Sequence, residues 1–105
     1  MDEIMQGTTP SLTIKIKPAD FLLANVARLE IYVQNGGAIT TYDESDVSID
    51  TDANTVSLTF TEEETAAFQN RFPVEAQGRF WLQGGGIVGI KKLSFSVADM
   101  LGVGD

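Results

Sequence analysis

The amino-acid sequence predicts an all-β fold, an immunoglobulin-like antiparallel β-sandwich of about seven strands with one short helical turn. Several short segments alternate between apolar and polar residues, which is the period of half-buried strands. Clusters of turn-forming residues separate these segments at regular intervals. The length of 105 residues also matches the usual size of one domain.

The alternation is clearest in residues 11–17, where Leu12, Ile14 and Ile16 share one face. Further strands are expected at residues 26–34, 38–42, 47–49, 55–61, 74–83 and 87–97. The Asn35-Gly36 pair is typical of a tight hairpin, and the three glycines at 84–86 indicate another hairpin tip. Thr61 and Glu64 have the spacing of a capping box, so we expect a helical turn that crosses between the sheets.

Three parts are expected along the chain: a flexible leader at residues 1–10, a single sandwich domain at 11–101 and a C-terminal tail at 102–105. Residues 19–25 are expected to form a short turn or a helical turn, with Phe21, Leu22 and Leu23 facing inward. Residues 98–101 are expected to close the domain with a helical turn.

Composition argues against several classes of function. The net charge of −8 opposes binding to nucleic acid and to anionic membranes. The sequence contains neither cysteine nor histidine, so thiolate chemistry is excluded and the commonest general base is missing. We therefore expect a protein that is not an enzyme and that uses no cofactor. No apolar stretch reaches the length of a membrane span, and no secretion signal is visible.

Four segments carry a family resemblance: residues 7–13, residues 26–39 around Gln34-Asn35-Gly36-Gly37, residues 54–68, and the strand of Gln77 and Arg79 with the glycines and the final residues 97–101. With these segments the chain resembles small structural proteins of phages and prophages of Gram-positive bacteria. It is similar to the N-terminal domain of phage baseplate upper proteins. Where that family has Gln-Val-Arg, this chain has Gly78 in place of the valine.

The resemblance implies a structural component that acts by protein–protein contact in a tail, baseplate or head–tail assembly. The expected partners are other virion proteins and further copies of the chain, and the expected location is the virion, or the host cytoplasm during assembly. The alternative is an immunoglobulin-like module that binds carbohydrate or a cell surface.

Three residues are candidates for partner binding. On the alternating pattern Trp81 points away from Phe80 and Leu82, on the same side as Arg79. Trp and Arg are the residue types most enriched in interface hot spots. Tyr32 has the same outward phase on an earlier strand, so Tyr32, Arg79 and Trp81 are predicted to form a contact face. The alternatives are that Trp81 lies inside, under a bulge or a helical turn, or that it simply covers its own sheet.

The stretch 43–64 holds eight of the 15 acidic residues and no basic residue. Asp50, Asp52 and Asn54 have the spacing of the first three ligands of an EF-hand loop, but Thr55 and Thr61 occupy the positions of its glycine and its glutamate. We expect a solvated turn followed by a capped helical turn, and no metal site. A weak cation site and a docking surface for a basic partner are the alternatives.

Overall fold

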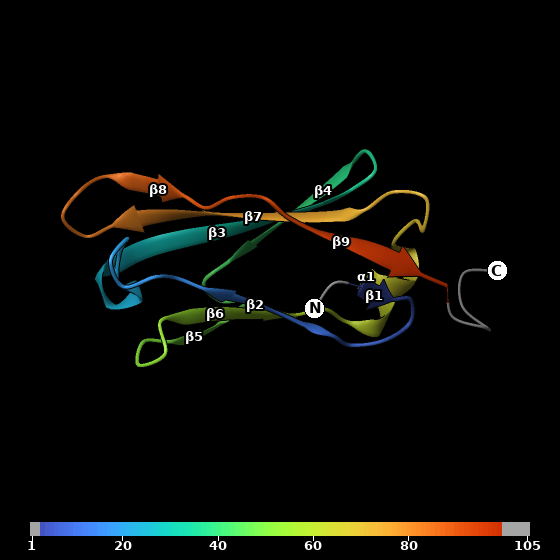
Figure 1. Cartoon of the computed structure of the whole chain (residues 1–105), viewed down its shortest axis with the longest axis horizontal. Helices are drawn as coiled ribbons and strands as arrows, with labels where there is room; N and C mark the ends of the chain where they lie inside the picture. Colours follow the sequence, from blue (N-terminus) through green and yellow to red (C-terminus); the bar gives the residue numbers. More distant parts are fainter. Residues whose placement is uncertain (1–2, 100–105) are drawn as a thin grey trace.

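The computed structural model describes residues 3–99, which form two packed β-sheets (Figure 1). The larger sheet has the strand order β1-β9-β7-β3-β4, with β8 also paired to β7, and the smaller has the order β2-β6-β5. The elements are β1 (Glu3–Met5), β2 (Ser11–Lys15), the 3-10 turn η1 (Leu23–Asn25), β3 (Val26–Asn35), β4 (Ala38–Asp43), β5 (Ser48–Asp50), β6 (Thr55–Thr59), α1 (Glu62–Ala67), β7 (Val74–Leu82), β8 (Ile87–Gly89) and β9 (Leu93–Ala98).

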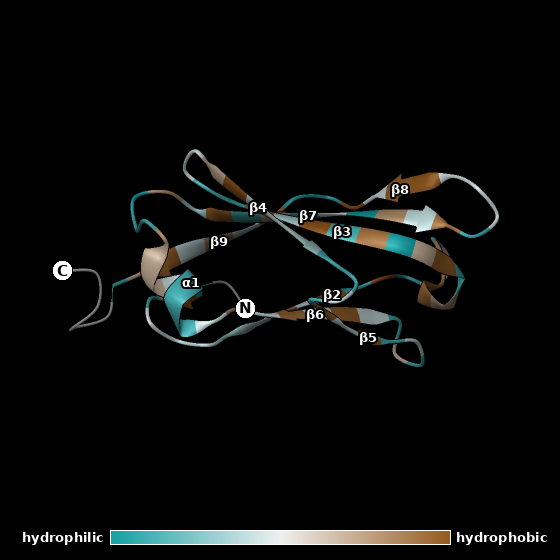
Figure 2. Cartoon of the chain, turned by 180° about the vertical axis from the view of Figure 1, so that it is seen from behind, coloured by the Kyte–Doolittle hydropathy of each residue, from teal (hydrophilic) through white to brown (hydrophobic). Residues whose placement is uncertain are grey.

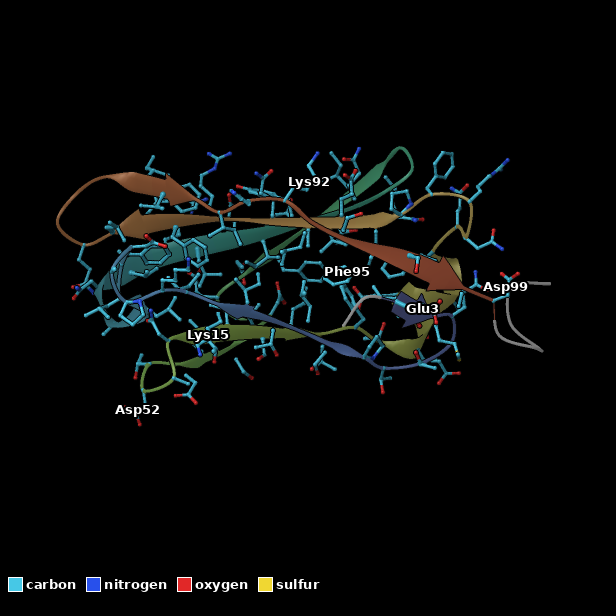
Figure 3. The ribbon with its side chains drawn as sticks, in the orientation of Figure 1. Glu3, Lys15, Asp52, Lys92, Phe95 and Asp99 are labelled. Carbon is cyan, nitrogen blue, oxygen red and sulfur yellow. The ribbon has the colours of Figure 1, made fainter. Side chains whose placement is uncertain are left out.

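This architecture confirms the predicted all-β sandwich, with nine strands among residues 3–99 in place of about seven. The core forms because alternate residues of each strand face the opposite sheet, and Figure 2 shows this alternation as stripes along β3. Phe95 projects from β9 into the space between the sheets (Figure 3). The apolar residues that fill this space are Ile4, Leu12, Ile14, Ile16, Phe21, Leu23, Leu29, Ile31, Val33, Val56, Leu58, Phe60, Val74, Ala76, Phe80, Phe95 and Val97.

The connection from β2 to β3 crosses from the small sheet to the large one, and a buried asparagine holds it. Asn54 lies in the turn before β6 with a φ of 57°, a left-handed conformation that asparagine tolerates. Its Nδ2 donates to the carbonyl oxygens of Ile16 (2.9 Å) and Phe21 (3.0 Å), and its Oδ1 accepts from the backbone N–H of Leu23 (2.8 Å). The side chain thus pairs three backbone groups that would otherwise be buried without partners.

A second asparagine holds the connection from β6 to β7. Asn35 ends β3, and its Oδ1 accepts from the backbone N–H of Gln69 (2.7 Å). Its Nδ2 lies 3.1, 3.2 and 3.4 Å from the carbonyl oxygens of Gln69, Phe72 and Pro73. The predicted hairpin is present, but Asn35 pairs with Ala38, and Gly36, with a φ of 63°, supplies the left-handed residue. Asn35 is therefore a buried anchor and lies outside the two-residue loop.

The helix α1 begins with the predicted capping box, in which the Thr61 side chain accepts from the Glu64 N–H and the Glu64 side chain accepts from the Thr61 N–H. The helix connects β6 of the small sheet to β7 of the large sheet, as expected. Thr65 is fully buried, and its hydroxyl donates to the Thr8 carbonyl oxygen (2.7 Å) and accepts from the Thr8 N–H (3.0 Å). This pair fixes the segment that leads from β1 into β2.

Several sequence predictions need correction. The predicted leader contains β1, which pairs in parallel with β9 and buries Ile4 completely, so the sheet is not wholly antiparallel. The strand predicted at 87–97 is two strands, because the chain leaves the sheet between Gly89 and Leu93. Leu22 was expected inside but is 45% exposed. The tail at 102–105 and residues 100–101 of the predicted final helical turn lie outside the described residues, and Ala98, where that turn was expected to begin, ends β9.

Gly78 generates a test of the packing. A Cβ atom at Gly78 would lie 2.9 Å from Cε2 of Phe80 and 3.2 Å from Cδ1 of Ile31, and the Phe80 ring is itself fixed at 5.0 Å from the Phe21 ring. We expect Gly78→Ala to lower the free energy of unfolding by about 1–3 kcal/mol, measured by chemical denaturation, because overpacking a full core forces side chains out of their rotamers. Gly84→Ala is the control, because a Cβ built there has no atom within 4 Å apart from those of Gly84 and its two chain neighbours. Equal stability of the two variants would contradict this account.

Candidate functional site

The three predicted contact residues lie together on the outward face of the large sheet. Tyr32 comes from β3, and Arg79 and Trp81 come from the neighbouring strand β7. Tyr32 and Trp81 are half-buried, whereas Arg79 is exposed. Their inward neighbours Ile31 and Phe80 are fully buried, so the alternation places these three side chains as the sequence predicts. The alternative position of Trp81 inside the fold is not the one observed.

Two arginines stack on the aromatic rings of this face. The guanidinium carbon of Arg79 lies 5.5 Å from the Tyr32 ring centre and 5.3 Å from the Trp81 ring centre. Arg28 approaches Trp81 more closely, at 4.3 Å. Such cation–π contacts stabilise exposed pairs by about 0.5–1 kcal/mol. We call Arg28, Glu30, Tyr32, Arg79 and Trp81 the aromatic–arginine face.

Glu30, which lies on β3, holds two side chains of this face in place by hydrogen bonds. Its carboxylate accepts from the Tyr32 hydroxyl at 2.6 Å and from Nη2 of Arg28 at 3.0 Å. The hydrogen bond from Tyr32 lowers the pKa of Glu30 against the opposing effect of burial, and Arg28 lowers it further. The same hydrogen bond raises the pKa of Tyr32. Glu30 is therefore ionised at neutral pH and holds Tyr32 and Arg28 in place.

Sequence reasoning missed Arg28 and Glu30 as members of this face. Both residues have the outward phase of Tyr32, and that spacing was the available signal. A register shift between Val26 and Arg28 then brings Arg28 opposite Trp81. This irregularity has no signature in the sequence, so the contact between Arg28 and Trp81 was not predictable from strand periodicity alone.

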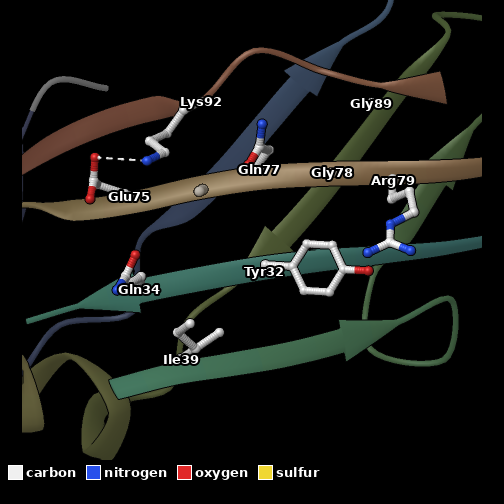
Figure 4. A pocket seen from close by; sticks show the side chains of 10 residues that line it. Tyr32, Gln34, Ile39, Glu75, Gln77, Gly78, Arg79, Gly89 and Lys92 are labelled. Atoms are coloured by element: carbon white, nitrogen blue, oxygen red, sulfur yellow. Dashed lines mark ion pairs between the residues drawn. The ribbon is translucent and has the colours of Figure 1, made fainter. Parts of the chain in front are cut away.

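A shallow groove of about 420 Å³ adjoins the aromatic–arginine face (Figure 4). It lies where the chain leaves the sheet after β8, so that Gly89, which has no side chain, faces Arg79 across the strand pair. Gln77 donates to the Ile90 carbonyl oxygen (3.0 Å), and Lys92 pairs with Glu75 at 3.6 Å. The groove is lined by Tyr32, Gln34, Ile39, Glu75, Ala76, Gln77, Gly78, Arg79, Gly89 and Lys92.

Two apolar side chains lie at opposite margins of the outward face. Ile39 is 63% exposed on β4, opposite Gln34, and Ile87 is 59% exposed on β8, opposite Trp81. No element among residues 3–99 covers this side of the large sheet (Figure 1). The outward face therefore combines aromatic, cationic and apolar groups in a form suited to protein contact.

The acidic stretch forms turns stabilised by its own backbone. Asp50 accepts from the backbone N–H groups of Asp52 (3.0 Å) and Ala53 (3.1 Å), which is an Asx-type turn. Asn54 is turned into the fold, with its side chain bonded to backbone groups, and is not available as a ligand. In the described part of the chain, no group of three or more acidic residues is placed to hold a metal ion.

Glu64, the last residue of this acidic stretch, joins α1 to β4 by accepting a hydrogen bond from the Tyr42 hydroxyl. Burial raises the pKa of Tyr42, and the contact with Glu64 raises it further. Burial also raises the pKa of Glu64, but the hydrogen bonds from Tyr42 and the Thr61 backbone together outweigh it and leave a lowered pKa. The folded protein therefore favours the ionised carboxylate.

No family model matches this chain, and no significant match occurs among curated proteins. Among residues 3–99, no helix has the length and apolar character needed to cross a membrane.

The Tyr42–Glu64 hydrogen bond predicts a pH-dependent contribution to stability. Because the pKa of Glu64 is lowered on folding, the contribution is present above pH 4.5 and is lost as the pH falls through the folded value. We expect Tyr42→Phe to destabilise the protein by about 1 kcal/mol at neutral pH.

Chemical denaturation of wild type and Tyr42→Phe, from neutral pH to below pH 4.5, measures the effect. The difference in free energy of unfolding between the two proteins should shrink as the pH falls. Glu64→Gln is the companion variant, because glutamine keeps the capping box but has no charge to lose. A difference between wild type and Tyr42→Phe that stays constant from neutral to acid pH would contradict the assignment.

Proposed function

We propose that this chain is a non-enzymatic structural protein of a phage or prophage, which acts through protein–protein contacts in a tail, baseplate or head–tail assembly. The observation that carries the contact role is the aromatic–arginine face on an uncovered sheet. The phage assignment rests on the sequence resemblance over most of the chain.

The aromatic–arginine face has the composition of a binding hot spot. Hot spots are enriched in Trp, Tyr and Arg and are surrounded by residues that exclude water. Trp81 lies between Arg28 and Ile87 on the neighbouring strands, and Ile87 is largely exposed. A partner that covers this region would desolvate both Trp81 and Ile87.

The face is also ordered before any partner binds. Glu30 fixes Tyr32 and Arg28 by hydrogen bonds, and Arg79 stacks between the two aromatic rings. Side chains that are already held in one conformation lose less entropy on binding, at about 0.5–1.5 kcal/mol for each immobilised side chain. The fixed conformation of these side chains supports a role of the aromatic–arginine face in binding a partner with high affinity.

The carbohydrate-binding alternative has less support from this geometry. Stacking on a sugar requires an open face of an aromatic ring. Arg28 lies over the Trp81 ring at 4.3 Å, and Arg79 lies near both Trp81 and Tyr32. A sugar ring would have to displace a guanidinium group that Glu30 also holds.

Catalysis by a carboxylate pair also lacks support. A general acid at neutral pH needs a raised pKa. Among the described carboxylates whose pKa is shifted, Glu30, Asp43 and Glu64 all have lowered values. Each of these groups accepts hydrogen bonds from neighbouring side chains, which favours a structural role.

The test is co-purification of the tagged chain with the products of its neighbouring genes, expressed together, followed by measurement of the dissociation constant for any complex. We expect Trp81→Ala and Arg79→Ala each to weaken binding about 30-fold, which corresponds to about 2 kcal/mol for a hot-spot residue. Trp81 is the only tryptophan, so its fluorescence reports whether the partner covers this face.

Arg71→Ala is the matched control. Arg71 also stacks on an aromatic ring, that of Phe72 at 5.7 Å, but it lies on the connection before β7. We expect this variant to bind as wild type does. Absence of any complex, or a complex that tolerates both Trp81→Ala and Arg79→Ala, would overturn the proposed contact face.

A further inference from the structure

The small sheet ends on both sides in strands with unpaired edges. β2 and β5 each pair with β6, and no other strand of residues 3–99 pairs with either of them. A free edge presents a row of N–H and C=O groups that can add a strand from another chain.

The register identifies the backbone groups that point outward from β2. The Ile16 N–H donates to the Asn54 carbonyl oxygen, and the Phe60 N–H donates to the Pro10 carbonyl oxygen, both at 2.9 Å. The direction of the backbone hydrogen bonds alternates along a strand. The N–H and C=O groups of Ile14 therefore also point toward β6, whereas those of Thr13 point away from it.

The same alternation applies to β5. Val56 is paired with Ile14, and its backbone groups form hydrogen bonds toward β2. The backbone groups of its neighbours on β6, Thr55 and Ser57, therefore point toward β5. Ser48 and Asp50 are their partners, which leaves Ile49 as the residue whose backbone groups point outward. The Ile49 side chain is also 41% exposed.

The β2 edge is basic. Lys15, Lys17 and Lys91 line a cavity of about 920 Å³ between β2 and the segment around β8, together with the single acid Asp20. None of these three lysines forms an ion pair within residues 3–99, where the ion pairs are Arg28–Glu30 and Lys92–Glu75. Figure 3 shows Lys15 on β2.

The β5 edge is acidic. The turn before β5 carries Glu44 and Asp46 and follows Asp43 at the end of β4, and the turn after β5 carries Asp52, labelled in Figure 3 at the tip of the loop. No basic residue occurs between positions 43 and 64, so nothing within this stretch neutralises the edge.

We propose that copies of this chain associate head to tail, with the β2 edge of one copy pairing with the β5 edge of the next. Opposite charges then meet at the contact, whereas β5 on β5 would bring like charges together. The contact uses different patches on the two copies, so repeats of it close into a ring or extend as a filament. This self-association goes beyond the proposed function, because it uses the edges of the small sheet and not the aromatic–arginine face, which stays open for another protein.

The test begins with the solution mass of the wild-type chain by light scattering at low and high ionic strength. We expect a mass above the 11.3 kDa of one chain at low ionic strength, falling toward that value as salt screens the edges. A wild-type chain that stays monomeric at every concentration would overturn the proposal. The partner-binding test of Trp81 would be unaffected, because it uses the other sheet.

Two edge variants then separate head-to-tail pairing from symmetric pairing. One carries Lys15→Glu with Lys17→Glu, and the other carries Glu44→Lys with Asp52→Lys. The native side chains of Glu44 and Asp52 accept no hydrogen bond among the described residues. Each variant alone should have the mass of one chain. An equal mixture should associate again as wild type does, because the intact β5 edge of the first variant meets the intact β2 edge of the second, and the two reversed edges also carry opposite charges.

Arg71→Glu with Lys92→Glu is the matched control for the lysine variant, since it makes the same change in net charge as Lys15→Glu with Lys17→Glu but on neither edge strand, and it should associate as wild type does. Circular dichroism confirms that each variant is folded. Association of either edge variant alone at the wild-type mass, or a mixture that stays monomeric, would overturn the head-to-tail contact.

Discussion

Each of two passages from the small sheet to the large sheet depends on a buried side-chain amide. Asn54 holds the passage between β2 and β3, and Asn35 holds the one between β6 and β7. Backbone groups in these passages lose water on burial, and each would cost about 1–3 kcal/mol if left unpaired. An amide offers both donors and an acceptor, which few other side chains of this size can do. Among the described residues no buried polar side-chain atom is left unpaired.

The strands were predictable because one face of each is buried, and a buried face imposes a period of two on the sequence. The same period placed Tyr32, Arg79 and Trp81 on one face. It failed where other constraints act. β1 is too short for a period to be visible, and the chain leaves the sheet at Lys91 although flanking residues favour strands. Asn35 precedes a glycine and therefore resembles a turn residue, while its side chain serves a distant segment.

The β-sandwich presents two kinds of surface that differ in chemistry. The outward face of the large sheet is ordered by Glu30 and carries stacked rings and guanidinium groups, which suits a contact made by side chains. The edges of the small sheet carry unpaired backbone groups and opposite charges, which suits a contact made by strands. The proposed assembly role uses both kinds of contact, on surfaces that do not overlap.

The most direct measurement is amide hydrogen exchange of the wild-type protein, residue by residue, at low and at high protein concentration. The account predicts that the Thr13 and Ile49 amides exchange quickly in dilute solution and gain protection together as the concentration rises. The Ile14 amide, which faces β6, should be protected at both concentrations. Exchange of Thr13 and Ile49 that does not change with concentration would contradict the account.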